Sequence, residues 1–170
     1  MMQRSCSDSH CVFVQNGLLL SEPVSKQANR FGQLGRELTK NPADVITLPH
    51  GQVASCVAAG GDKSSGHSAV GTTTGDLLTF GCDRWLQLGL GASSGGASGY
   101  TWSDGKLWQR DPQLVSALHS ILPGKSKCNV VDVSCGSEHT AALCISGHVI
   151  TWGRGNKGKC DKIRGWAYCM

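Results

Sequence analysis

Residues 139–153 read HTAALCISGHVITWG, and residues 67–81 read HSAVGTTTGDLLTFG. The two stretches align without a gap, because each begins with a histidine and carries a glycine at the ninth and at the fifteenth position. Phe80 of one stretch aligns with Trp152 of the other. Self-similarity of this kind is typical of a chain built from repeated structural units. The fold is therefore decided by what one unit forms.

Each stretch predicts a β-hairpin. Alternating apolar residues lead to a turn, at Thr74-Gly75 in one stretch and at Ser146-Gly147 in the other, and a second apolar strand follows. Glycine suits these turns because it adopts positive φ without a steric penalty. We also expect a half-buried strand before each hairpin, at Val53 to Ala59 and at Val131 to Cys135.

A short ending motif follows the repeated strands. It reads GQLG at 32–35 and LQLG at 86–89, and the corresponding third stretch is GKCD at 158–161. The third copy therefore lacks the Gln, Leu and final Gly. Gly35 and Gly89 are 54 residues apart, whereas 72 residues separate Gly89 from Asp161. The longer spacing indicates an insertion, which we assign to residues 91–127.

These residues resemble the repeats of the regulator of chromosome condensation family. The signature of that family is a Gly, a nearby His-Thr or His-Ser, a Gly turn, a strand ending in Trp-Gly, and a GQLG turn. The resemblance covers roughly residues 28–161. It assigns structural repeat positions to Gly32, Gly35, His67, Gly75, Gly81, Gly89, Gly136, His139, Gly147, Trp152, Gly153 and Gly158.

The resemblance implies an all-β fold. In this family four-stranded blades form a β-propeller that closes as a ring of seven, and at about 50 residues per blade this chain supplies about three blades. We therefore expect a partial β-propeller with one inserted amphipathic helix. The expected organisation is a degenerate or irregular N-terminal segment at 1–27, repeats at 28–161 with the insertion at 91–127, and an irregular tail at 162–170.

The insertion carries the predicted helix. Asp111 is a good N-cap and Pro112 suits the first helical position. One apolar face would then consist of Leu114, Val115, Leu118, Ile121 and Leu122. Such a face either packs on the edge of the sheets or docks a partner protein, with Trp102 and Trp108 as anchors.

Composition agrees with a turn-rich β protein. Glycine accounts for 23 of 170 residues and charged residues for only 16%, which disfavours a coiled coil or a disordered polyelectrolyte. No apolar run approaches the roughly 18 residues that span a bilayer, and the N-terminus lacks a secretory signal. We therefore expect a soluble intracellular protein without a membrane partner, in the nucleus or the cytoplasm, and leave import into an organelle open.

The nine cysteines form no CxxC pair. A disulfide framework is therefore not expected, and no second pair of Cys or His stands at zinc-ligand spacing. We expect these thiols to be small buried residues, and we expect no metal and no cofactor.

The basic excess lies near the C-terminus. The formal net charge is +4, and residues 123–170 hold seven Lys and Arg against three Asp and Glu. The segment 154–164 reads RGNKGKCDKIR, and its basic residues are Arg154, Lys157, Lys159, Lys162 and Arg164. This segment is either a solvated turn or a binding site for phosphates or an acidic protein face.

The sequence shows no recognisable catalytic motif. Paired carboxylates and HExxH are absent from the sequence. A thiol nucleophile with a histidine base could be read at Cys135 and His139, or at Cys56 and His67. The two histidines occupy equivalent repeat positions, however, which favours a structural role such as bonding to neighbouring backbone.

The resemblance implies a non-enzymatic protein-interaction module. Because the founding member of the family is an exchange factor for the small GTPase Ran, the chain is a candidate part of a guanine-nucleotide exchange factor. One alternative is chromatin or nucleic-acid binding through segment 154–164. Another is a truncated product without independent function. The incomplete ring also suggests self-association that completes the propeller.

Overall fold

The two repeated stretches form the hairpins that the sequence predicts. In the first, β6 (His67–Thr72) pairs with β7 (Leu77–Cys82), and in the second, β11 (His139–Cys144) pairs with β12 (Val149–Gly153). The register is the same in both, because His67 lies opposite Gly81 and His139 lies opposite Gly153. The predicted turn glycines, Gly75 and Gly147, have φ values of 76° and 85°.

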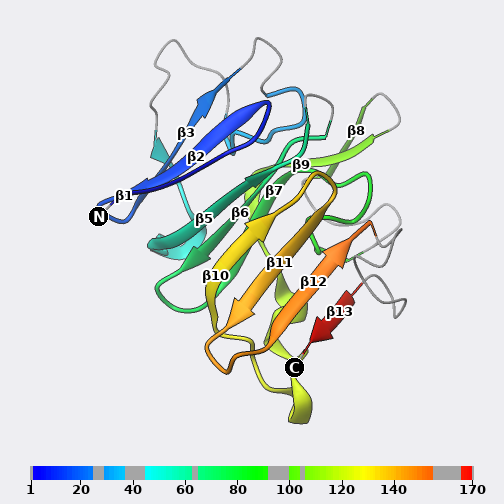
Figure 1. Ribbon diagram of the computed structural model, residues 1–170. Helices are drawn as coiled ribbons and strands as arrows, with labels where there is room; N and C mark the ends of the chain where they lie inside the picture. Colours follow the sequence, from blue (N-terminus) through cyan, green and yellow to red (C-terminus); the bar gives the residue numbers. More distant parts are fainter. Residues whose placement is uncertain are drawn as a thin grey trace.

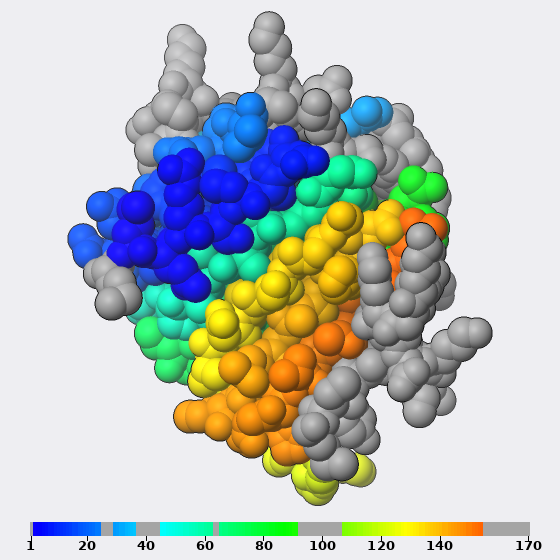
Figure 2. Space-filling view, in the orientation of Figure 1, coloured from blue at the N-terminus to red at the C-terminus, as the bar shows by residue number. Residues whose placement is uncertain are grey.

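Antiparallel sheets stand side by side along the molecule (Figure 1). The computed structural model describes residues 2–24, 29–36, 45–62, 65–91, 100–103, 106–154 and 166–169. Within these ranges there are three sheets, which we call blades 1, 2 and 3. Their strand orders are β1-β2-β3-β4, β5-β6-β7-β9-β8 and β10-β11-β12-β13. The space-filling view shows the three blades as adjacent diagonal bands (Figure 2). The predicted all-β partial propeller is confirmed.

The remaining strands complete the blades on either side of the hairpins. They are β1 (Met2–Cys6), β2 (His10–Gln15), β3 (Leu18–Pro23), β4 (Val45–Ile46), β5 (Ala54–Gly60), β8 (Tyr100–Ser103), β9 (Lys106–Leu114), β10 (Val130–Cys135) and β13 (Trp166–Cys169). Within the described ranges, three short 3-10 turns lie between strands, namely η1 (Pro49–Gly51), η2 (Ser116–His119) and η3 (Pro123–Lys125). In the described residues no helix is long and apolar enough to cross a membrane.

Blade 1 includes the N-terminal segment, in which the sequence showed only a faint repeat. Its hairpin β2-β3 turns through two residues, Asn16 and Gly17, with φ values of 52° and 78°. Positive φ at both positions matches the twist of the flanking strands, and Asn-Gly is the preferred pair for such a turn. Strand β2 begins at His10, opposite Pro23, which is the register that His67 and His139 have in blades 2 and 3.

The inserted amphipathic helix is not formed, which corrects that part of the predicted fold. Residues 106–114 are strand β9, and the only helical turn that follows directly is η2. Pairing with β7 supplies partners for backbone groups that the sheet edge would otherwise leave open. Pro112 lies where the register of this pairing shifts, between Gln109 and Gln113, and proline is tolerated at such irregularities. The apolar residues are nevertheless buried, since Leu118 is 1% exposed and Leu122 is 7% exposed.

Asp76, in the β6-β7 turn, binds the segment 116–127, which includes η2 and η3. Its Oδ1 atom lies 2.7 Å from Lys127 Nζ and 3.0 Å from His119 Nε2. Its Oδ2 atom accepts hydrogen bonds from Gln52 and Thr74. The segment therefore closes the end of blade 2 that is opposite the start of β6.

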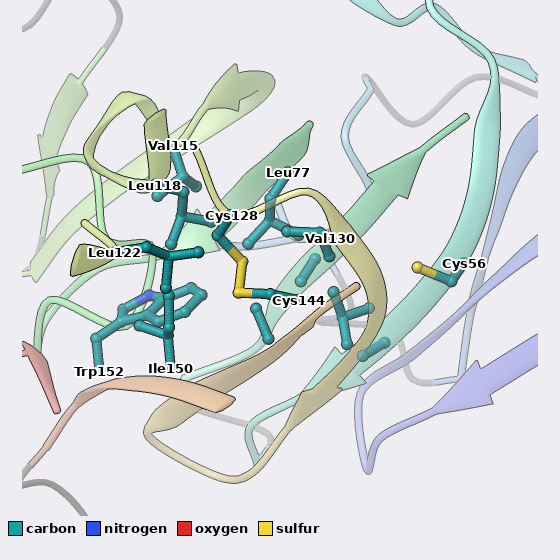
Figure 3. Packing of buried hydrophobic residues seen from close by; sticks show 14 residues of the cluster. Cys56, Leu77, Val115, Leu118, Leu122, Cys128, Val130, Cys144, Ile150 and Trp152 are labelled. Atoms are coloured by element: carbon teal, nitrogen blue, oxygen red, sulfur yellow. A yellow bond between two sulfur atoms is a disulfide. The ribbon is translucent and has the colours of Figure 1, made fainter. Parts of the chain in front are cut away.

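The core lies between the blades. Successive residues of β5 alternate, so that Val57 and Ala59 belong to the cluster shared with blade 1, whereas Cys56 and Ala58 belong to the cluster shared with blade 3. Figure 3 shows the second cluster, in which Trp152 and Ile150 of blade 3 face Leu118 and its neighbours. Burial on both faces of blade 2 explains why every residue of β6 and β7 is buried.

Among the cysteines that the structure describes, two pairs form disulfides, contrary to the prediction. Cys6 and Cys11 are opposite residues of β1 and β2, and their sulfur atoms are bonded. Cys128 and Cys144 are bonded within the core between blades 2 and 3 (Figure 3). The spacing along the chain did not show these pairs, because it is the strand register that brings them together. Among the remaining described thiols, Cys56 and Cys82 are buried, as expected.

Candidate interaction surface at the His end of the blades

A histidine begins the second strand of each blade, and in blades 1 and 2 it bonds to the next blade. His10 Nε2 lies 2.7 Å from Ser68 Oγ, and His67 Nε2 lies 3.1 Å from Thr140 Oγ1. We call the end of the blades where these strands begin the His end. Ser68 and Thr140 each follow the histidine of their own blade, so the same contact is repeated at two successive junctions.

Each hydroxyl donates a hydrogen bond to a backbone carbonyl oxygen. Ser68 Oγ donates to Gln33 O at 2.9 Å, and Thr140 Oγ1 donates to Gln87 O at 2.8 Å. A hydroxyl has a single proton, so the histidine Nε2 atom must be the donor toward the hydroxyl oxygen. The neutral tautomer with hydrogen on Nε2 satisfies the whole chain of bonds.

The protonation state of the two buried histidines agrees with this arrangement. Burial, helped by the neighbouring His67, lowers the pKa of His10 to about 3. Burial and the neighbouring His139 lower the pKa of His67 to about 4. Both imidazoles are therefore neutral near pH 7, as the donation to Ser68 and Thr140 requires.

The carbonyls that accept these bonds belong to the ending turns, residues 29–35 and 83–89. In each turn the glutamine side chain folds back, so that Gln33 Oε1 accepts from Phe31 N at 2.9 Å and Gln87 Oε1 accepts from Trp85 N at 2.8 Å. Both glutamines are fully buried. The repeated Gln thus holds its own turn rigid while its carbonyl anchors the next blade.

A second side chain closes each turn. Asn29 Oδ1 accepts a hydrogen bond from Leu34 N at 3.1 Å, and Asp83 Oδ1 accepts one from Leu88 N at 2.8 Å. The final glycines, Gly35 and Gly89, have φ values of 66° and 67°. The two turns are therefore equivalent in hydrogen bonding and in backbone conformation.

The aromatic residue before each strand-ending glycine packs against the turn of the preceding blade. Trp152, which is 1% exposed, donates from Nε1 to Gln87 O at 2.9 Å. Phe80 is its counterpart, and a Cβ atom on Gly35 would come within 2.8 Å of its ring. Blade 1 departs from this pattern, because Cys11 and Glu22 stand where blades 2 and 3 have a hydroxyl and an aromatic ring.

Aromatic and basic side chains gather on the turn of blade 2, where Arg84 is exposed and Trp85 is half-buried. The guanidinium of Arg84 lies 5.1 Å from the centre of the Trp85 ring, and that of Arg154 lies 4.2 Å from it. Arg154 also donates to Glu138 Oε2 at 2.7 Å. Leu86, next in the chain, is 40% exposed. We call Arg84, Trp85 and Leu86 the knob.

Of the binding residues predicted from the sequence, Trp108 and Arg154 have side chains in the described part of the chain. Trp108 is half-buried and contacts the guanidinium of Arg110, 5.7 Å from its ring centre. Arg154 is engaged by Glu138 and Trp85, which weakens the case for it as a free phosphate ligand. Strand β8 includes Trp102, but its side chain lies outside the described part of the chain, as do Lys157, Gly158, Lys159, Lys162 and Arg164.

Sequence reasoning missed the knob. A signal for it was present, because the first turn reads NRFGQLG and the second reads DRWLQLG. Leu86 therefore replaces a repeat glycine, Gly32, and the aromatic residue beside it is larger. Such a departure from the repeat at an exposed turn points to a local role.

Two further observations bear on other chemistry. Within the described ranges no group of three or more His, Cys, Asp or Glu side chains is placed to hold a metal ion. Cys56 and His67 are both buried in blade 2, burial raises the pKa of the Cys56 thiol, and His67 is bonded to Thr140. This arrangement does not activate a nucleophile, which needs a lowered thiol pKa or an adjacent base.

Family models match two parts of the chain. Both are described as the regulator of chromosome condensation (RCC1) repeat, one matching residues 74–143 and the other residues 130–159. The matches run from the β6-β7 turn to a point just beyond β12. They include Thr140 and the turn whose Gln87 carbonyl accepts its hydrogen bond.

Individual proteins are similar over most of the chain. The rat protein named probable E3 ubiquitin-protein ligase HERC4 is 30% identical over 170 residues, which covers 92% of this chain and 13% of that protein. Human Protein RCC2 is 31% identical over 151 residues, with 77% and 26% covered. The crystal structure of Prp20p from Saccharomyces cerevisiae superposes with a TM-score of 0.71 at 20% identity, over 97% of this chain and 36% of that chain.

The structural similarity to Prp20p shows the propeller fold, and the coverages show that this chain corresponds to only part of each relative. The chain spans little more than a third of Prp20p and about a quarter or less of the two curated relatives.

Proposed function

The chain belongs to the regulator of chromosome condensation (RCC1) repeat family, and from this premise we propose that it is a non-enzymatic module that binds a protein partner through the loops at its His end. In the finer form of the proposal the partner is a small GTPase and the chain is part of a guanine-nucleotide exchange factor.

The proposal rests on a difference between the buried polar side chains of the junctions and the side chains of the loops. The histidines, hydroxyls and glutamines that could do chemistry are buried in the blade junctions and bonded to one another. What the His end offers to solvent are loop side chains held on a rigid frame, including Arg84 and Trp85. Binding residues are typically carried on loops that a rigid scaffold positions.

The relatives support a binding role in two ways. Similar segments occur in a probable ubiquitin ligase and in Protein RCC2, proteins that carry much additional chain. A segment shared by such different proteins is best explained as a module for recognition. Prp20p is described with binding properties to Gsp1p and histones, which makes a small GTPase the first partner to test.

Exchange requires differential binding rather than catalytic groups. A module that binds the nucleotide-free GTPase more tightly than the loaded form shifts the equilibrium toward nucleotide release. The side chains needed for this are contact residues on one end of the blades. This requirement fits a set of blades whose buried polar side chains bond to one another at the junctions and leave the loop side chains for contact with a partner.

The test is release of a fluorescent guanine nucleotide from a panel of small GTPases. We expect the wild-type chain to accelerate release from at least one GTPase and Trp85→Ala to reduce that acceleration. Ile145→Ser is the matched control, because Ile145 is 73% exposed and lies in the β11-β12 turn at the opposite end. No acceleration with any GTPase, or equal loss in the control variant, would contradict the GTPase form of the proposal.

A further inference from the structure

The two ending turns share their hydrogen bonds but differ at one strained position. Leu86 has a φ of 62°, and its counterpart Gly32 has a φ of 69°. A side chain in this left-handed region is strained, whereas glycine adopts it freely. The Leu86 side chain is 40% exposed, so burial does not offset the strain. Strain that the fold does not need is characteristic of functional positions.

The residues around Leu86 are those that dominate protein interfaces. Trp and Arg are enriched among the residues that contribute most to binding free energy. Trp85 is held in place from its backbone, through the bond of its N–H to Gln87 Oε1, and from its ring, on which Arg154 stacks. The corresponding residue of blade 1, Phe31, is only 1% exposed. The knob is therefore specific to the turn of blade 2.

Charge at the knob selects the kind of partner. Arg84 is exposed and forms no ion pair with any residue in the described ranges, whereas Arg154 is neutralised by Glu138 at 2.7 Å. One available cation beside an apolar side chain fits a mixed acidic and apolar surface. A nucleic-acid backbone would meet Leu86 and the carboxylate of Glu138, so it fits less well.

We propose that Arg84, Trp85 and Leu86 dock an extended protein segment that places an apolar side chain against Leu86 and Trp85 and an acidic residue beside Arg84. This docking does not depend on the partner being a GTPase. It goes beyond the proposed exchange activity and can hold if that activity is absent.

The experiment measures fluorescence anisotropy of a labelled peptide in which Glu alternates with Leu. Control peptides carry Lys for Glu or Ser for Leu, and a short DNA duplex serves as a competing probe. Leu86→Gly removes the apolar side chain and the strain together, so we expect its urea midpoint to rise while its peptide affinity falls at least about fivefold. Arg84→Glu should weaken binding by a similar factor, and Ile145→Ser should leave it unchanged.

The combination separates binding from folding, because Leu86→Gly is expected to be more stable than the wild type. Loss of affinity in a more stable variant supports a docking role. Affinity unchanged in both Leu86→Gly and Arg84→Glu would overturn the proposal, and so would equal binding of the Lys peptide or tighter binding of the DNA duplex. Failure of nucleotide exchange would leave this result intact.

Discussion

The Nε2 atom of His67 lies 3.1 Å from the Oγ1 atom of Thr140, and this contact joins blade 2 to blade 3. Because Thr140 donates its proton to Gln87 O, the direction of every hydrogen bond at the junction is fixed. The equivalent contact of His10 with Ser68 joins blades 1 and 2. The same kind of complementary side-chain pair therefore joins the sheets at both junctions.

Thr140→Val should lower the free energy of unfolding by about 2 kcal/mol. The variant keeps the shape of the side chain but leaves the His67 N–H without its acceptor inside the core, and an unsatisfied buried polar group costs on the order of 1–3 kcal/mol. Urea titration followed by Trp fluorescence measures the change. Thr140→Ser retains the hydroxyl and should cost clearly less. Equal losses in the two variants would show that the hydroxyl is not what matters.

Acid should destabilise the protein through the buried histidines. Their pKa values are about 3 for His10 and about 4 for His67 in the folded protein, against an ordinary histidine value of 6.5. Between about pH 6.5 and pH 4 the unfolded chain binds protons that the folded chain does not. The free energy of unfolding therefore decreases as the pH is lowered, by about 1.4 kcal/mol per pH unit for each histidine. Urea titrations at several pH values measure this slope.

The matched variant for the acid experiment is His67→Gln. It removes one of the two titrating groups, so the slope of stability against pH should fall by about half, whatever the variant costs near pH 7. A slope identical to that of the wild type would mean that His67 is protonated in the folded state.

Leu86→Gly should raise the free energy of unfolding by roughly 1 kcal/mol, because it relieves the strain of a side chain at positive φ. Gly32→Ala, at the equivalent position, should do the reverse. Besides its φ of 69°, a Cβ atom on Gly32 would come within 2.6 Å of the Arg110 Cα atom. Chemical denaturation of both variants compares the two turns, and a stabilised Gly32→Ala would contradict their equivalence.

Reduction of the Cys128–Cys144 disulfide should lower the free energy of unfolding by about 3 kcal/mol, the chain-entropy value for a closed loop with a sequence separation of 16. The Cys6–Cys11 loop, with a separation of 5, should contribute less. Peptide mapping without reductant identifies the linked pairs, and the double variant Cys6→Ser, Cys11→Ser isolates the larger effect. Recovery of both Cys128 and Cys144 as alkylated thiols would refute the pairing.

Repeat spacing and apolar alternation were enough to predict both hairpins and the strands before them. They were not enough at residues 111–122, where the helical spacing of Leu114, Leu118 and Leu122 also fits a strand end followed by a 3-10 turn. There the open edge of β7 decided the outcome. Pairing of β9 with β7 joins segments that are distant in the sequence, so the local pattern of apolar residues does not predict it.

The sequence predicted the candidate site less completely than it predicted the fold. The disulfide of Cys6 with Cys11 depends on strand register, which spacing alone leaves undefined. The stacking of Arg154 on Trp85 joins residues of two blades and is visible only when the blades are packed. Comparing the two turns residue by residue would have marked Leu86 as the odd member, because a repeat glycine is expected there.

The central claim is that partner binding uses the His end of the blades. The most direct measurement is backbone amide hydrogen exchange of the chain with and without a nucleotide-free small GTPase. The account predicts protection in the loops that lie before β2, β6 and β11 and in the turn 83–89, with the β6-β7 and β11-β12 turns unchanged. Protection confined to those opposite turns, or no protection with any GTPase of the panel, would contradict it.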